Sequence, residues 1–176
     1  IARKHIQFGG AYLLTVVLLL ATPQAIRAEE TTPPPPTPAE TTLTVVGQQA
    51  PDFTVATLEG ETFTLSAQKN KVVLINWFAT WCPPCQAEMP HLQKEVWEKF
   101  AAKGLVMISV ARQENSDVVA PFVKKYAVTW PFALDPERTA YAKYAEAYIP
   151  RNTLVGPDGR LKLCNSAYSF ADKHHD

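Results

Sequence analysis

The chain has 176 residues, enough for one domain with short appendages, and its apolar content of 47% is sufficient for a sizeable hydrophobic core. Seventeen lysine and arginine residues balance seventeen aspartate and glutamate residues, so the formal net charge is zero. The sequence has no long basic or acidic run, which argues against nucleic-acid binding. We therefore expect no nucleic-acid partner.

The first 28 residues have the layout of a secretory signal. Basic residues precede an apolar stretch from Ala11 to Ala21, and small residues lead to Ala28, after which a signal peptidase would cut. The apolar stretch is short for a membrane span of about 20 residues, although residues 6–26 would just suffice. We predict that residues 1–28 are a cleaved signal peptide or an N-terminal membrane anchor. The protein is then periplasmic or otherwise extracytoplasmic.

The stretch from residue 29 to residue 42 consists of Thr, Pro, Glu and Ala, and includes four consecutive prolines at positions 33–36. It has no apolar face to bury, and proline runs favour an extended polyproline II backbone. We predict a semi-rigid linker here, followed by a domain over residues 43–176. A ligand for a proline-recognition module is the alternative interpretation.

Strand and helix patterns alternate in the rest of the chain. A β-hairpin is predicted over residues 53–65, and helices are predicted from Pro83 to about Ala101, over 117–126, and from 135 to about 148. Further strands are predicted at 72–77, 105–110, 131–134, 152–155 and 161–164. Pro90 is expected to kink the first helix. Strands that alternate with helices indicate an α/β layered domain.

Two cysteines separated by two prolines, Cys82 and Cys85, lie between the apolar strand at 72–77 and the first helix. This order places both thiols at the helix start, where the helix dipole and free N–H groups favour a thiolate. A thiolate attacks disulfides, and two thiols this close can form one. We therefore predict a redox-active Cys82–Cys85 disulfide, with Cys82 as nucleophile and Cys85 as the resolving thiol. A zinc site is the alternative, but Cys164 and the tail histidines form a poor second ligand pair.

Five short motifs occur along the chain: Ala50-Pro51-Asp52-Phe53, Phe78-Ala79-Thr80-Trp81-Cys82-Pro83-Pro84-Cys85, Glu88-Met89-Pro90, Tyr148-Ile149-Pro150 and Pro157-Asp158-Gly159. Their combination resembles the thioredoxin superfamily, and more narrowly the exported, often membrane-tethered TlpA/ResA-like thiol-disulfide oxidoreductases. The resemblance runs from about residue 46 to residue 163. It implies a thioredoxin-like α/β fold in which helices flank a central mixed sheet, with an added N-terminal β-hairpin.

The resemblance also implies roles for individual residues. The family proline that matches Pro150 is cis and faces the disulfide, so we expect a cis bond here. Asn76 stands where thioredoxin itself has a buried aspartate, and Glu88 is the expected substitute that tunes the thiols. A solvated helix glutamate is the alternative for Glu88. Substrate-binding roles are expected for Trp81, Pro83, Pro84 and Ile149.

The sequence also predicts whether several other side chains are buried or exposed. Trp77 and Phe78 are expected in the core, and Cys164 is expected to be a buried, inert thiol more readily than a redox group. Arg151 is expected either to contact a partner or to be a plain surface arginine. In a domain of this family, a helix that covers the last strand is expected after Cys164. The polar, short segment 165–176 is therefore interpreted as a truncated or altered end, and its histidines as solvated.

The function that these observations favour is an exported dithiol reductase for disulfides of exported proteins, with apocytochrome c, and thus cytochrome c biogenesis, as one family role. The expected partners are such clients and a membrane or soluble thiol-disulfide electron donor. No cofactor and no metal are expected. One alternative is a thioredoxin-like copper chaperone that binds Cu(I) through two thiolates. Another is a thiol peroxidase, which would need proline and threonine or serine where the chain has Ile75 and Ala79.

Overall fold

A computed structural model of the chain describes residues 34–166, and every structural statement below refers to this range. The predicted signal or anchor segment (1–28), the first five residues of the predicted linker (29–33) and the tail histidines lie outside the described residues. Within residues 34–166, no helix combines the length and the hydropathy needed to cross a membrane.

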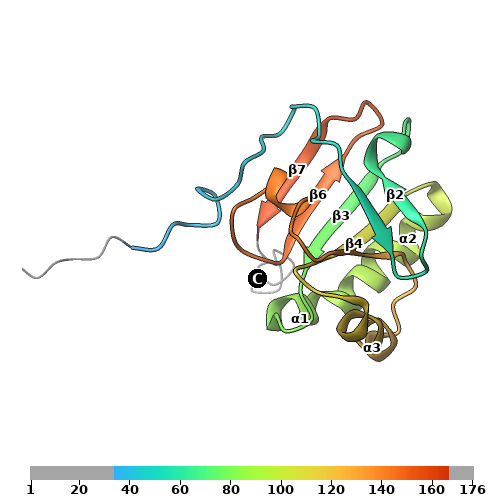
Figure 1. Ribbon diagram of the computed structural model, residues 1–176. Coiled ribbons are helices and arrows are strands. Elements are labelled where there is room, and N and C mark those ends of the chain that lie inside the picture. The colour runs from blue at the N-terminus through green and yellow to red at the C-terminus, as the bar shows by residue number, and fades with distance from the viewer. Residues whose placement is uncertain (1–33, 167–176) are drawn as a thin grey trace, which may run out of the picture. The chain divides into compact units, whose positions relative to one another are not determined.

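Seven strands form one mixed sheet in the order β2-β1-β5-β4-β3-β6-β7. The strands are β1 (Thr54–Thr57), β2 (Thr62–Thr64), β3 (Val73–Phe78), β4 (Val106–Arg112), β5 (Phe132–Asp135), β6 (Arg151–Val155) and β7 (Leu161–Ser166). Strand β4 pairs in parallel with β3 and β5, whereas the other pairs in the sheet are antiparallel. Figure 1 shows β3 and β4 side by side in the middle of the sheet. The predicted mixed sheet with an N-terminal hairpin, β1–β2, is confirmed.

The first predicted helix is a helical path built from several segments. They are α1 (Pro83–His91), the π-helix η2 (Leu92–Trp97), α2 (Glu98–Phe100) and the 3-10 helix η3 (Ala101–Lys103). Pro90 has no N–H to donate to the preceding turn, which is why a kink was predicted here. The helix is irregular at this point because a π-helical stretch begins two residues later, at Leu92. The second predicted helix is α3 (Ser116–Tyr126).

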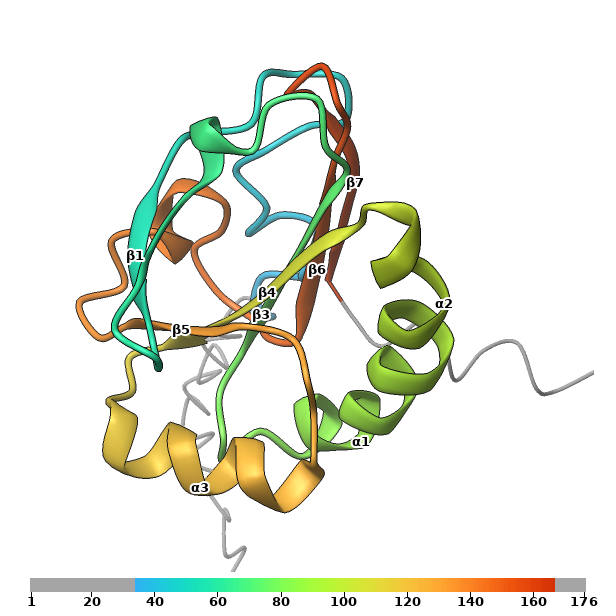
Figure 2. The same ribbon diagram turned by 90° about the vertical axis from the view of Figure 1, so that its right-hand side faces the viewer.

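Alternation of side chains along β3 divides the core into two layers. Leu74 and Phe78 pack on the side of α1 and α3, whereas Ile75 and Trp77 pack on the opposite side. Figure 2 shows α1 and α2 along one side of the sheet and the orange turn that contains the 3-10 helix η4 (Tyr141–Lys143) on the other. Trp77 and Phe78 are fully buried, so their predicted core positions are confirmed.

The predicted helix from residue 135 to residue 148 is wrong, because only η4 is helical there. The carboxylate of Asp135 accepts hydrogen bonds from the N–H groups of Ala140 and Tyr141 and so closes a turn. Arg138 and Tyr148 have positive φ values of 59° and 68°, which a right-handed helix does not allow. These tertiary contacts and left-handed residues override the helical pattern of the sequence.

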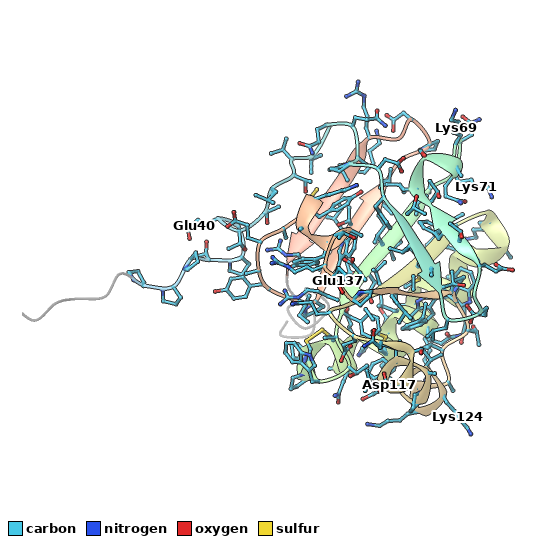
Figure 3. All side chains as sticks on the ribbon, in the orientation of Figure 1. Glu40, Lys69, Lys71, Asp117, Lys124 and Glu137 are labelled. Carbon is cyan, nitrogen blue, oxygen red and sulfur yellow. A yellow bond between two sulfur atoms is a disulfide. The ribbon has the colours of Figure 1, made fainter. Side chains whose placement is uncertain are left out.

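Most charged side chains lie at the surface. Figure 3 shows Lys69, Lys71 and Lys124 projecting at the periphery. The buried charged residues among those described are Glu88, Glu114, Asp135 and Arg151. Burial of a charged group is unfavourable unless other groups compensate for it, so each of these four side chains needs a structural explanation.

We expect Ile108→Ala to destabilise the protein by about 2–5 kcal/mol, because Ile108 in β4 has no exposed surface and its truncation leaves a cavity. The matched control is Val118→Ala in α3, where the side chain is 45% exposed. Urea unfolding with an unchanged m-value measures both effects. Equal shifts for the two variants would contradict this description of the core.

Candidate functional site

The two cysteines of the predicted site form a disulfide at the start of α1. Cys82 is the N-cap residue of the helix, and its sulfur accepts a hydrogen bond from the N–H of Cys85 at 3.3 Å. Pro83 and Pro84 occupy the two positions between them and have no N–H. The Cys85 N–H is therefore the backbone donor within the first turn that stabilises negative charge on the Cys82 sulfur after reduction.

The loop before β6 lies against this disulfide. The Ile149–Pro150 peptide bond is cis, as the resemblance predicts. The carbonyl oxygen of Ile149 is 3.7 Å from the Cys82 sulfur, and Pro150 itself is buried. The structure thus brings together Cys82, Cys85 and Pro150 from segments about 65 residues apart in the sequence.

The surroundings of the disulfide are apolar and largely exposed. The exposed residues are Trp81, Pro83, Pro84 and Tyr148, and Ile149 is half-buried. The indole of Trp81 is 64% exposed, which excludes a core-packing role for this residue. The predicted substrate-binding residues therefore form one apolar rim around a sulfur that is itself nearly covered.

Glu88, one turn after Cys85 on α1, is fully buried. Its Oε1 accepts a hydrogen bond from Asn76 Nδ2 at 2.6 Å, and its Oε2 accepts one from Asn152 Nδ2 at 3.1 Å. The network continues because Asn76 Oδ1 accepts a hydrogen bond from the Ser109 hydroxyl at 2.9 Å. The interpretation of Glu88 as a solvated helix residue is therefore wrong.

Burial raises the pKa of the Glu88 carboxyl from 4.5 to about 7, because desolvation disfavours the carboxylate. The hydrogen bonds from Asn76 and Asn152 stabilise the carboxylate and oppose this increase, but they do not cancel it. Glu88 consequently exists at neutral pH as a mixture of acid and carboxylate. A group in this state can give or take a proton in the pH range where thiols react.

A second buried carboxylate holds the loop in front of Cys82. Glu114 is 8% exposed. It accepts a hydrogen bond from the Thr80 N–H at 2.8 Å and one from the Thr80 hydroxyl at 2.5 Å. The carbonyl oxygen of Thr80 accepts a third hydrogen bond, from Gln86 Nε2 at 2.7 Å. Both backbone polar atoms of Thr80 are thus fixed, two residues before Cys82.

Glu114 was not among the predicted site residues, although its position in the sequence carries a signal. Glu114 follows β4, and β3 and β4 are parallel neighbours, with Phe78 beside Ala111. Their carboxyl ends therefore meet at one edge of the sheet, which is where sites in α/β folds gather. A carboxylate four residues beyond the strand predicted at 105–110 was a reasonable candidate.

Two further interpretations of the sequence are settled by burial. Arg151 is only 4% exposed, so both expectations for it, a partner contact and a plain surface arginine, are wrong. Cys164 is a free cysteine on β7, half-buried rather than buried, and its sulfur accepts a hydrogen bond from the Thr44 hydroxyl at 3.5 Å. No group of three or more potential metal ligands of the His, Cys, Asp and Glu types is found within residues 34–166.

The chain is similar to known proteins over most of the described residues. The model of the AhpC/TSA family matches residues 46–163. The thiol-disulfide oxidoreductase ResA of Bacillus cereus is 34% identical over 116 residues, which is 66% of this chain and 66% of the relative. This chain therefore matches slightly less than two thirds of the length of that relative.

Two solved structures share the fold. A candidate protein disulfide isomerase from Bacteroides thetaiotaomicron has a TM-score of 0.71 at 35% identity, over 75% of this chain and 87% of that chain. A candidate thiol:disulfide interchange protein DsbE from Chlorobium tepidum has a TM-score of 0.67 at 25% identity, over 74% of this chain and 91% of that chain. The thioredoxin-like fold expected from the sequence is confirmed.

We expect the free energy of unfolding to fall as the pH rises from 4.5 to above 7. Glu88 has a folded-state pKa of about 7 and an ordinary value of 4.5, so in this range the native state binds more protons than the unfolded state. The stabilisation is complete below pH 4.5 and is lost through pH 7, with an upper limit of about 3 kcal/mol.

Glu88→Gln should remove this slope, although the variant loses one acceptor and is less stable at low pH. Urea unfolding of both proteins at several pH values between 4.5 and 8 measures the difference. Parallel pH profiles for the two proteins would show that the Glu88 carboxyl titrates as an ordinary glutamate.

Proposed function

Because the chain belongs to the thioredoxin-like AhpC/TSA family, we propose that it is an exported thiol-disulfide oxidoreductase that reduces disulfide bonds of other exported proteins. The observation that carries the proposal is the Cys82–Cys85 disulfide at the first turn of α1. The relative named thiol-disulfide oxidoreductase ResA supports the same reaction class. An apocytochrome c is a client that fits this class, and cytochrome c biogenesis is then the process served.

The proposed reaction begins with both cysteines as thiols. The Cys82 thiolate attacks one sulfur of a client disulfide, and the other client sulfur leaves as a thiolate and takes up a proton. The Cys85 thiol then loses its proton, and its thiolate attacks the Cys82 sulfur. This step releases the second client sulfur and forms the Cys82–Cys85 disulfide. Two electrons pass to the client, and a membrane or soluble thiol-disulfide donor returns two electrons to the chain.

Glu88 is proposed to move the proton of Cys85. The two residues are three positions apart on α1 and so lie on the same face of the helix. A pKa of about 7 lets the carboxylate accept the thiol proton as Cys85 attacks, and lets the acid return it on the next reduction. The amides of Asn76 and Asn152 hold the carboxyl in place through both states.

The rim around the disulfide is proposed to bind the client. Trp81, Pro83 and Pro84 offer exposed apolar surface beside the Cys82 sulfur, and the loop of Ile149 and Pro150 closes its other side. Such a surface suits the apolar side chains of a polypeptide that is not yet folded.

Export is proposed to depend on residues 1–28, as a cleaved signal or as a retained membrane tether. The order of basic, apolar and small residues supports this assignment. Outside the cytoplasm a dithiol becomes oxidised unless it is re-reduced, so the proposal includes a dedicated electron donor.

We expect Cys85→Ser to accumulate a mixed disulfide with its client, because Cys82 can still attack while the resolving thiol is gone. Capture from cells followed by non-reducing electrophoresis measures the adduct, and Cys82→Ser is the matched control that should capture nothing. Limiting iodoacetamide should label Cys82 in the reduced wild-type protein. Capture by Cys82→Ser together with labelling of Cys85 would reverse the two roles.

We expect a reduction potential nearer the thioredoxin value of about −270 mV than the DsbA value of about −120 mV. Pro83 and Pro84 remove two N–H donors from the first turn, and each charge-assisted hydrogen bond lost to the Cys82 thiolate is worth about 1.5–3 kcal/mol. A shift of about 30 mV corresponds to about 1.4 kcal/mol. Equilibration with glutathione buffers measures the potential, and a value above about −180 mV would indicate an oxidase or isomerase.

A further inference from the structure

Arg151 is a buried guanidinium in a place where no carboxylate neutralises it. It is 4% exposed, and neither ion pair found within the described residues includes it. Such a group persists in a protein interior only when hydrogen bonds satisfy its donors. Its acceptors are the carbonyl oxygens of Pro38, Ala147 and Tyr148 and the hydroxyls of Thr41, Thr42 and Tyr141.

Apart from the hydroxyl of Tyr141, which lies on η4, these acceptors come from two segments that are far apart in the sequence. One is residues 36–43, here called the strap, which belongs mostly to the stretch predicted as a linker. The other is residues 144–150, here called the loop, which leads to the cis peptide bond beside the disulfide. Figure 1 shows the blue strap running next to the orange loop. Arg151 therefore links the strap to the loop.

Backbone hydrogen bonds join the same two segments. The N–H of Leu43 donates to the Tyr144 carbonyl oxygen at 2.9 Å. The N–H of Glu146 donates to the Thr41 carbonyl oxygen, also at 2.9 Å. These bonds form an antiparallel bridge between the strap and the loop. The contact is thus built from main-chain pairing as well as from the arginine.

The loop needs this support because its conformation is unfavourable on its own. Tyr148 has a left-handed backbone with φ of 68°, which a residue with a side chain adopts at a cost. The Tyr148 carbonyl accepts hydrogen bonds from Arg151 Nε at 3.1 Å and from the Tyr141 hydroxyl at 2.5 Å. Its own hydroxyl donates to the Pro36 carbonyl oxygen at 2.6 Å. The next residue, Ile149, places its carbonyl oxygen 3.7 Å from the Cys82 sulfur.

We propose that Arg151 and the strap position the loop against the Cys82 sulfur, so that the strap is a working part of the active site. The inference rests on the proposed function and adds a positioning residue and a positioning segment to it. A polypeptide disulfide that reaches Cys82 must lie along the loop, so its reaction depends on the loop geometry. A small reagent has to meet only the sulfur and does not lie along the loop, so its reaction depends on the loop geometry far less.

The test compares two reactions of the full chain in its reduced form. One is reduction of a synthetic peptide closed by a single disulfide, and the other is alkylation of Cys82 by iodoacetamide. Arg151→Met removes the donors at similar length, and Thr41→Val combined with Thr42→Val removes two acceptors of the strap. Arg160→Met is the matched control, because Arg160 is exposed and its hydrogen bond to the Gly47 carbonyl lies outside the strap and the loop.

We expect Arg151→Met and the double threonine variant each to lower kcat/KM for the peptide disulfide about tenfold or more, as small misplacements of reacting groups do. Alkylation should stay within about twofold of the wild-type rate, because the thiol and its helix are unchanged. Arg151→Lys, which keeps a donor but loses the planar fork, should recover part of the loss. The control should match the wild type in both reactions.

Three outcomes would overturn the inference. Peptide reduction at the wild-type rate in both variants would show that the loop needs no support. If the variants lose peptide reduction and alkylation equally, and both losses follow a fall in the melting temperature, then Arg151 and the strap act on stability alone. If the wild-type chain is alkylated at Cys82 but does not reduce the peptide, the proposed function is overturned together with the inference. The first two outcomes overturn the inference alone, so the two kinds of failure can be told apart.

Discussion

The N–H of Cys85 reaches the Cys82 sulfur at 3.3 Å because Cys82 caps α1 in an extended conformation, with φ of −86° and ψ of 109°. That geometry depends on the strand before it and the helix after it. Strand β3 is buried along its whole length, which fixes where the chain leaves the sheet. Glu114 then fixes Thr80, so the sulfur is placed by groups that it does not touch.

Two buried charged residues flank this junction, and the structure stabilises them in different ways. Glu88 receives hydrogen bonds from two amides and keeps a raised pKa of about 7, so it remains able to change its charge. Arg151 forms no ion pair within the described residues, and its N–H groups donate hydrogen bonds to neutral oxygen atoms instead. The first arrangement suits a group that exchanges protons, and the second suits a group that holds two segments together.

Local patterns predicted much of this protein, and long-range contacts account for the rest. The hairpin, the strand before the cysteines and the start of α1 follow from alternation, apolar runs and capping, which a short window of sequence contains. The region after Asp135 was predicted as a helix because its left-handed Arg138 and Tyr148 leave no signal in the residue types. The burial of Arg151 could not be predicted, since three of its acceptors lie about 110 residues earlier in the chain.

The edge strand β2 has a consequence for a protein proposed to meet unfolded polypeptides. Free strands of another chain can add to an open sheet edge through unpaired N–H and C=O groups. Strand β2 has only three residues, Thr62–Thr64, and the preceding turn carries Glu59 and Glu61, both at the surface. A short edge beside like charges is a poor template for strand addition. This edge of the sheet is therefore poorly suited to pair with an extended polypeptide.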